Sequence, residues 1–162
     1  MNPTIQIIPI PAFMDNYIWL LYQGNKAIVV DPGDAEVVIK TLESLQLTLC
    51  AILITHHHSD HIDGVEALQS AYPKAKVYAP RHEDFAFTHI DVTENDRIEI
   101  QLDSTVNAPA LAFKVLDLPG HTLGHVAYLF SNSNNDYLFC GDTLFGAGCG
   151  RLFEGSPTQM LN

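Results

Sequence analysis

Four histidines and one aspartate lie within the seven residues THHHSDH at positions 55–61, directly after the apolar run at 49–54. Imidazole nitrogens and carboxylate oxygens are ligands that zinc, iron and manganese accept in proteins. A solvated polar loop is the alternative, but chance alone rarely places four histidines so close together. The run therefore predicts a metal-binding loop that follows a buried strand.

The spacing within this loop predicts two ligand pairs. Backbone alternation at a strand end sends His56 and His58 to the same side, where they can bind one cation, and turns His57 away. Asp60 and His61 then point toward a second position as a helix begins. We predict an orienting or structural role for His57, since such partners are common around metal ligands. Two divalent cations are the expected cofactors, with zinc favoured and iron or manganese as alternatives.

Two later segments carry candidate ligands directly after apolar strands. LPGHTLGH contains His121, and FCGDTLF contains Asp142. In layered folds, sites collect where strands end in loops. His121 would complete the first position, and Asp142 could bridge both cations through its two oxygens. Alone, the histidine could be a turn residue and the aspartate an Asx turn or a cap, but together with the upstream motif both are predicted to be ligands.

Two more polar residues are predicted to support the ligands. His125 is a weaker ligand candidate than His121, and an orienting or structural role fits it better. Asp31 ends a predicted strand before Pro32 and Gly33, where it could brace the metal loop through hydrogen bonds. A plain turn carboxylate is the alternative for Asp31.

Strands and helices alternate along the chain in the predicted secondary structure. Apolar residues at helical spacing predict one helix after the N-cap Asp34 and another from Ile62 to Tyr72. Runs rich in β-branched and aromatic residues predict strands at 4–10, 17–22, 27–30, 49–54, 76–79, 98–102, 111–118, 126–130 and 137–140. This order, without an internal repeat, predicts sheets covered by helices, an α/β or α+β fold.

Length and composition limit the class of protein. A chain of 162 residues suits one domain, taken here as residues 1–162, and can bury a core. The net charge of −11, from 8 Lys and Arg against 19 Asp and Glu, argues against nucleic acid or an anionic membrane as partner. No apolar run approaches the roughly 18 residues of a membrane span, and no signal peptide is evident, so a cytoplasmic protein is expected. We expect a monomer.

The last seven residues predict the beginning of a helix. Ser156 fits an N-cap, and Pro157 fits the first helical position. A helix this short is far below the roughly 12 to 15 residues at which an isolated helix becomes marginally stable. We therefore expect the chain to be truncated.

The motifs THHHSDH, PGHTLGH and GDTLF resemble those of the metallo-β-lactamase superfamily. Within it, FMDNYIWLL and GCGRLFEG resemble the glyoxalase II family of hydroxyacylglutathione hydrolases, and the resemblance extends over the whole chain. It implies a four-layer αββα sandwich, incomplete at its C-terminus, with the metals at one edge of the two sheets. The helical C-terminal portion that supplies much of the family's glutathione pocket is expected to be missing.

The resemblance also implies a ligand set. Metal 1 would be bound by His56, His58 and His121, and metal 2 by Asp60 and His61, with Asp142 bridging. A further family ligand to metal 2 is a histidine in a Gly-His-Glu-Tyr-type segment, and this sequence contains no such segment.

The implied reaction is hydrolysis of S-D-lactoylglutathione, or a related 2-hydroxyacyl thioester, to glutathione and D-lactate in methylglyoxal detoxification. Coordination to a dication can lower the pKa of water from about 15.7 to about 7, so a hydroxide held between the metals is the predicted nucleophile. Asp60 and Asp142 are the predicted catalytic side chains. Arg151 matches a family position that contacts glutathione, and Phe153 lies where some relatives carry tyrosine. An ordinary exposed arginine is the alternative for Arg151.

Two other hypotheses remain. A persulfide dioxygenase of similar fold would use one iron for oxygen chemistry and leave the second-metal ligands unused. Asp60, His61 and the segment 148–155 argue against it. A truncated chain that binds metal weakly and turns over nothing is the third hypothesis, and the missing C-terminal portion supports it.

Overall fold

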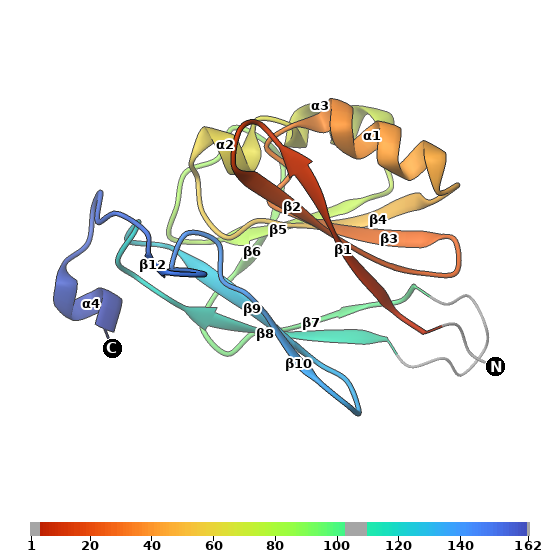
Figure 1. Cartoon of the computed structure of the whole chain (residues 1–162). Helices are drawn as coiled ribbons and strands as arrows, with labels where there is room; N and C mark the ends of the chain where they lie inside the picture. Colours follow the sequence, from red (N-terminus) through yellow and green to blue (C-terminus); the bar gives the residue numbers. More distant parts are fainter. Residues whose placement is uncertain (1–3, 103–109, 162) are drawn as a thin grey trace.

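Two β-sheets pack face to face, with a layer of helices on the larger one, in the computed structural model of the chain (Figure 1). The structure describes residues 4–102 and 110–161. Residues 1–3, 103–109 and 162 of the predicted domain lie outside the described residues. The predicted class, sheets covered by helices, is confirmed, with three layers formed by the described residues.

The larger sheet has the strand order β1-β2-β3-β4-β5-β6. Its strands are β1 (Gln6–Ala12), β2 (Asn16–Gln23), β3 (Lys26–Val30), β4 (Thr48–Leu53), β5 (Lys76–Pro80) and β6 (Ile90–Val92). The first three are joined as antiparallel hairpins, whereas β3 to β6 run parallel. Parallel neighbours need a crossover, which α1 (Ala35–Ser44) provides between β3 and β4, and α3 (Val65–Ala71) between β4 and β5.

The smaller sheet is antiparallel, in the order β10-β9-β8-β7. Its strands are β7 (Arg97–Ile100), β8 (Leu111–Asp117), β9 (Val126–Ser131) and β10 (Asp136–Phe139). An Asx turn joins β9 to β10, because the Asn132 side-chain oxygen accepts hydrogen bonds from the N–H groups of Asn134 and Asn135, both at 2.9 Å.

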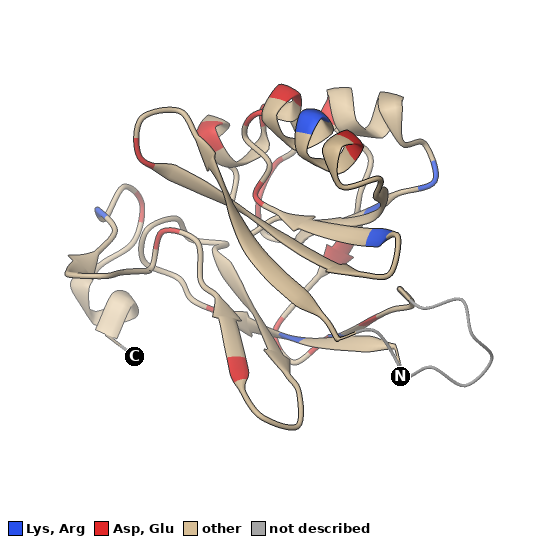
Figure 2. Ribbon diagram, turned by 45° about the vertical axis from the view of Figure 1, so that its right-hand side comes forward, with Lys and Arg blue, Asp and Glu red and all other residues tan. Residues whose placement is uncertain are grey.

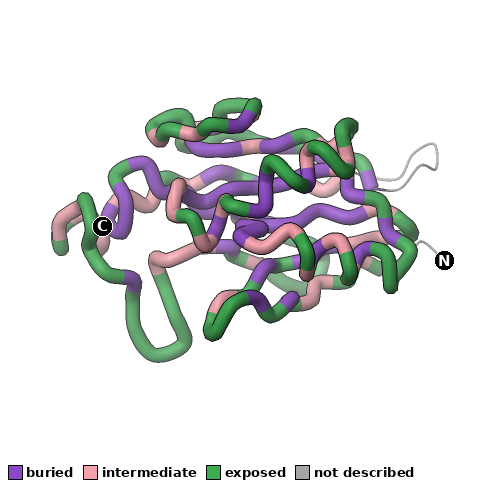
Figure 3. The backbone as a smooth tube through the Cα atoms, turned by 90° about the horizontal axis from the view of Figure 1, so that it is seen from above, coloured by how far each residue is buried: buried purple, intermediate pink, exposed green. Residues whose placement is uncertain are grey.

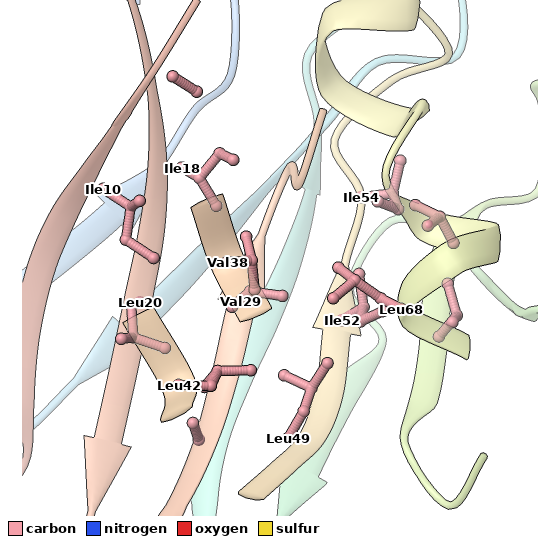
Figure 4. Close-up of a cluster of buried hydrophobic side chains, with 14 of the residues drawn as sticks. Ile10, Ile18, Leu20, Val29, Val38, Leu42, Leu49, Ile52, Ile54 and Leu68 are labelled. Atoms are coloured by element: carbon pink, nitrogen blue, oxygen red, sulfur yellow. The ribbon is translucent and has the colours of Figure 1, made fainter. Parts of the chain in front are cut away.

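The core lies on both faces of the larger sheet. On its outer face, Val38, Leu42 and Leu68 of the helices pack against strand residues such as Val29 and Ile52 (Figure 4). On its inner face, a second cluster joins the two sheets and includes the fully buried Phe113 and Tyr128. Seen from above, the buried stretches follow the central strands (Figure 3). Burial on both faces explains the near-continuous apolar sequence of β3 and β4.

The helix boundaries confirm one prediction and correct another. Asp34 caps α1, since its side chain accepts hydrogen bonds from the N–H groups of Glu36 at 2.9 Å and Val37 at 3.4 Å. The predicted helix from Ile62 to Tyr72 is wrong as a single element, because α2 (Ser59–Ile62) ends before α3 begins. Between them, the Gly64 N–H donates to the Pro32 carbonyl at 3.0 Å, which ties the break to the turn after β3.

Short elements escaped prediction. β6 has two exposed residues out of three, and the hairpin of β11 (Leu144–Phe145) and β12 (Gly148–Cys149) is exposed throughout, so no burial pattern marks them. The predicted helix start at Ser156 is confirmed by α4 (Pro157–Leu161), which buries no residue. Asn162 lies outside the described residues.

Strand direction brings several chain segments to one edge of the sandwich, where α2 and β12 lie at the left of Figure 1. Asp31 follows β3, and the THHHSDH loop follows β4 at the same end of two parallel strands. Aspartate and glutamate residues are distributed over many strands, helices and loops (Figure 2). Among the described residues, no helix has the length and apolar character that crossing a membrane requires.

Candidate metal centre

His56, His58 and His121 converge at this edge of the sandwich. The loop after β4 carries the first two, and the loop between β8 and β9 carries His121. His58 Nδ1 lies 3.1 Å from His56 Nε2 and 2.9 Å from His121 Nε2. His56 and His121 are buried. Three imidazole nitrogens from both sheets therefore face one point.

Hydrogen bonds on the outer side of the rings decide which nitrogens carry protons. His121 Nδ1 lies 2.7 Å from the main-chain oxygen of Arg151, which can only accept, so the proton is on Nδ1. The Thr55 hydroxyl donates to a carboxylate at 2.7 Å, so its oxygen is left to accept from His56 Nδ1 at 3.0 Å. Both Nε2 atoms thus direct lone pairs at the shared point beside His58 Nδ1. Such converging acceptors suit a bound cation.

A second group of ligand-type atoms adjoins the first. Asp142 Oδ1 lies 3.2 Å from His61 Nε2, and Asp142 Oδ2 lies 3.3 Å from His121 Nε2. Asp60 Oδ2 is 3.5 Å from His61 Nε2, and Asp31 Oδ2 is 3.1 Å from His61 Nδ1. Asp142 therefore faces both groups, one oxygen toward each.

The charges around His61 favour a cation at this position. Burial by itself would lower the pKa of His61, but the adjacent carboxylates of Asp142 and Asp31 outweigh it and raise the pKa to about 10. Burial would likewise raise the pKa of Asp142, yet His61 holds it below its usual value. In the metal-free protein a proton thus supplies the positive charge that the two carboxylates attract.

Asp31 and His125 contact the ligands from behind. Asp31 accepts hydrogen bonds from the Thr55 N–H at 2.8 Å and the Thr55 hydroxyl at 2.7 Å, while its own backbone has the unusual φ of 52°. His125 Nε2 accepts the Asp142 N–H at 3.2 Å, and its ring stacks on His56 with centroids 4.8 Å apart. Both residues lie where a supporting role was predicted, and that role stays a prediction.

The turn before Asp142 depends on a glycine. Gly141 has φ +48°, and a Cβ there would lie 2.3 Å from Thr55 Oγ1 and 2.7 Å from His125 Nε2. Only a residue without a side chain allows the β10 end to approach the metal loop this closely.

Sequence reasoning missed Asn16 and Thr55, which contact candidate ligands. The Asn16 side-chain amide donates to Asp60 Oδ2 at 2.8 Å, from the start of β2. The Thr55 hydroxyl links Asp31 to His56, since it donates to the Asp31 carboxylate and accepts from His56 Nδ1. Thr55 is the first residue of THHHSDH, and Asn16 lies in FMDNYIWLL. Both residues belong to the sequence motifs, but threonine and asparagine are not among the residue types that commonly bind transition metals.

Arg151 and Phe153 lie at the rim of the site. The Phe153 ring contacts the rings of His58 and His121, with centroids 5.0 Å and 5.3 Å apart, and is 62% exposed. The Arg151 side chain is exposed, while its carbonyl binds His121 Nδ1. The Phe153 N–H donates to the His121 carbonyl at 3.1 Å, which fixes this segment against the turn between β8 and β9. Contact of Arg151 and Phe153 with a substrate stays a prediction.

A cleft of about 660 Å³ opens on the other side of the group. Its lining includes Asp60, His61 and Asp142, together with Asp15, Tyr17, Trp19, Leu138, Phe139, Leu144 and Phe145. The site therefore has a cleft with a mixed polar and apolar lining beside His61 and an exposed rim beside His121.

The residues present fit divalent metal ions. His56, His58 and His121 form one candidate group, with ligand atoms within 4.8 Å of one another, and Asp31, His56 and His61 form another. Both ring nitrogens of His61 are buried and lack an aligned hydrogen bond, although carboxylate oxygens lie within 3.2 Å. Buried polar atoms left in this state are usually completed by water or an ion.

The buried histidines predict acid sensitivity of the metal-free protein. Burial lowers the pKa of His125 to about 4, so between about pH 6.5 and 4 the unfolded chain binds a proton that the folded chain does not. The free energy of unfolding should therefore fall by about 3 kcal/mol from pH 7 to pH 4 through His125 alone. His61 does not offset this loss, because its raised pKa affects stability only above about pH 6.5.

Urea denaturation of metal-stripped protein at both pH values measures this effect. His125→Gln, which keeps an acceptor for the Asp142 N–H, should lose that part of the acid sensitivity. Equal pH dependence of the variant and the unaltered protein would contradict the prediction.

Comparisons with known proteins agree with this geometry. Residues 12–161 match the family described as the metallo-beta-lactamase superfamily. A hydroxyacylglutathione hydrolase from Methylobacillus flagellatus is 56% identical over 157 residues, which are 97% of this chain and 58% of that protein. The chain thus spans somewhat more than half the length of the curated relatives it matches.

Solved structures share the fold. The B3 metallo-beta-lactamase BLEG-1 superposes with a TM-score of 0.76 at 28% identity, covering 98% of this chain and 82% of that one. The protein TTHA1623 in a di-iron-bound form gives a TM-score of 0.72 at 26% identity, covering 95% and 82%.

Proposed function

Because this chain belongs to the metallo-β-lactamase superfamily and carries a histidine-rich site for divalent metal, we propose that it hydrolyses S-(2-hydroxyacyl)glutathione thioesters such as S-D-lactoylglutathione. The observation that carries the proposal is the position of Asp142, with one carboxylate oxygen toward each ligand group. The name hydroxyacylglutathione hydrolase of several relatives at 48–56% identity supports the choice of substrate.

Six residues would hold two cations. The first position takes His56, His58 and His121, the second takes Asp60 and His61, and Asp142 reaches both. When bound, divalent cations supply Lewis acidity that makes water nucleophilic near neutral pH and polarises a carbonyl. Zinc is favoured for this ligand set, with iron or manganese as alternatives, and the di-iron-bound TTHA1623 supports iron as a candidate.

The protein side chains act by orientation. Asn16 fixes the rotation of the Asp60 carboxylate through one hydrogen bond, so that its second oxygen remains available. Asp31 and Arg151, through its carbonyl, hold the outer nitrogens of His61 and His121, which keeps the inner nitrogens free to bind metal. No serine or cysteine nucleophile is needed in this scheme.

The two sides of the site suit the two parts of a thioester. We place the glutathione moiety at the exposed rim, where the Arg151 guanidinium can pair with a carboxylate and Phe153 offers an aromatic face. The acyl group then extends toward the cleft beside His61, whose Tyr17 and Trp19 walls accept apolar groups. The thioester carbonyl lies between, over Asp142.

Replacing Arg151 tests the rim assignment. Arg151→Ala should raise KM for S-D-lactoylglutathione about 10-fold and change kcat much less, since an exposed charge pair contributes binding rather than chemistry. Arg97→Ala, at an exposed arginine on β7, is the matched control and should leave both constants unchanged. An unchanged KM in Arg151→Ala would remove Arg151 from the substrate site.

The reaction itself is tested under nitrogen. Metal-loaded protein should consume S-D-lactoylglutathione and release free thiol without oxygen, and elemental analysis should find more than one metal equivalent per chain. Oxygen-dependent loss of glutathione persulfide with one iron per chain would instead favour the dioxygenase hypothesis. The close grouping of His61, Asp60 and Asp142 supports the hydrolase over that alternative.

A further inference from the structure

His57, the loop histidine that faces away from the metal position, lies between two carboxylates. Its Nδ1 is 3.0 Å from Glu83 Oε2, and its Nε2 is 3.4 Å from Glu154 Oε1. Glu83 follows β5 and Glu154 follows β12, so the three residues come from three distant segments. None of them belongs to either group of candidate metal ligands.

Glu83 is the unusual member of this cluster, because its side chain is only 2% exposed. Burying a carboxylate is destabilising unless donors surround it. The Thr122 hydroxyl donates to Glu83 Oε1, whereas Oε2 has the His57 ring as its near neighbour and no aligned hydrogen bond. Burial correspondingly raises the pKa of Glu83. A buried carboxylate such as Glu83, beside the loop that carries His56 and His58, therefore needs a structural or functional explanation.

Both carboxylates also hold the turn that carries His121. Glu83 binds the Thr122 hydroxyl, and Glu154 Oε2 accepts the Leu123 N–H at 2.9 Å. The turn lies so close to Glu83 that a Cβ on Gly124 would be 2.4 Å from Glu83 Cγ and 2.7 Å from the preceding carbonyl. The segment at 82–83 is therefore fitted against the turn without room for a side chain.

We propose that Glu83 is a positioning residue for the metal centre, which it serves by joining the loop of His56 and His58 to the turn of His121 through His57 and Thr122. The three candidate ligands of the first position come from these two segments, and their mutual placement decides how tightly a cation is held. Glu154 supports the same connection from the solvent side. The inference rests on the metal site of the proposed function but requires no particular substrate.

Metal affinity is the measurement that tests this role. Zn²⁺ and Co²⁺ binding to metal-stripped protein, by competition with a chromophoric chelator, should be about 10-fold weaker at the tighter position in Glu83→Ala, the low end of the range found when direct partners of metal ligands are removed. The Co²⁺ absorption bands should shift as well, since they report ligand geometry. Glu83→Gln keeps the size and an acceptor for Thr122, so it should restore most of the affinity. Glu66→Ala, at an exposed glutamate of α3, should behave as the unaltered protein.

A double substitution separates positioning from general packing. If Glu83 acts through His57, then Glu83→Ala should weaken metal binding much less in a His57→Phe background than in the unaltered protein. Should Glu83→Ala fail to fold, His57→Phe removes the same contact from the other side and should by itself weaken Zn²⁺ binding relative to the Glu66→Ala control. Metal affinities within two-fold of the Glu66→Ala control, alongside reduced thermal stability, would overturn the proposal and leave Glu83 a packing residue.

The result is independent of the thioester assay. Weakened Zn²⁺ binding in a protein that hydrolyses no thioester would sustain the positioning role and reject the proposed function. Normal Zn²⁺ binding by Glu83→Ala in a protein that does hydrolyse S-D-lactoylglutathione would reject the positioning role and sustain the proposed function.

Discussion

Asp142→Asn should lower kcat/KM for S-D-lactoylglutathione about 10³-fold, because the cations that supply Lewis acidity would lose the carboxylate proposed to hold both of them. The substitution keeps the shape of the side chain but removes its charge and replaces one oxygen with an amide donor. That donor would point at either His61 Nε2 or His121 Nε2, both of which must accept a cation instead. Steady-state kinetics and metal content of the same preparation measure the effect.

Asp136→Asn is the control for this substitution. Asp136 is an exposed aspartate at the start of β10, the strand that leads to Asp142. It should retain full activity and both metals. Activity of Asp142→Asn within a few-fold of this control, with two metals bound, would show that the cations need no bridging carboxylate.

The sequence predicts most of the longer strands, because burial imposes simple patterns on them. β3 and β4 are apolar on both faces since they lie at the centre of the larger sheet, and their short length and β-branched residues favour strands over helices. The prediction fails where burial is absent or contacts are remote. The break at Gly64 depends on the Pro32 carbonyl, which no local pattern reveals.

The sequence predicts which candidate ligands come together, but it does not predict the partners that hold them. Residues at the ends of neighbouring strands were expected to meet, and the structure brings His121 and Asp142 to the THHHSDH loop. The partners behind the ligands were harder to foresee. Glu83 is 39 residues from its partner Thr122, and a lone glutamate carries no signal of burial in the sequence. The carbonyl of Arg151 cannot be predicted from side-chain type at all.

This difference has a physical origin. Metal ligands must be His, Asp, Glu or Cys, so chemistry restricts them to few residue types and makes clusters visible. Orienting partners need only a donor or an acceptor, which every residue's backbone and many side chains supply. Function therefore shows more clearly in the ligands than in the residues that hold them.

Removal of metal should lower the thermal midpoint of unfolding by about 10 °C. A ligand present at 1,000 times its Kd stabilises the folded state by about 4 kcal/mol, and 1 kcal/mol shifts the midpoint by about 2–4 °C in a domain of this size. The metal-free site is costly besides, because His56 and His121 are buried with their Nε2 lone pairs converging on one point. A cation removes that conflict, and unfolding releases the cation.

Scanning calorimetry with saturating Zn²⁺ and with a chelator measures the shift. In His56→Ala the shift should largely vanish, because the first position loses a ligand and the buried cluster is relieved. His82→Ala, at an exposed histidine in neither ligand group, should preserve it. The chelated protein could instead unfold at the same temperature as the metal-loaded protein and still cleave S-D-lactoylglutathione. That result would mean that the clustered histidines do not bind the cations on which the proposed hydrolysis depends.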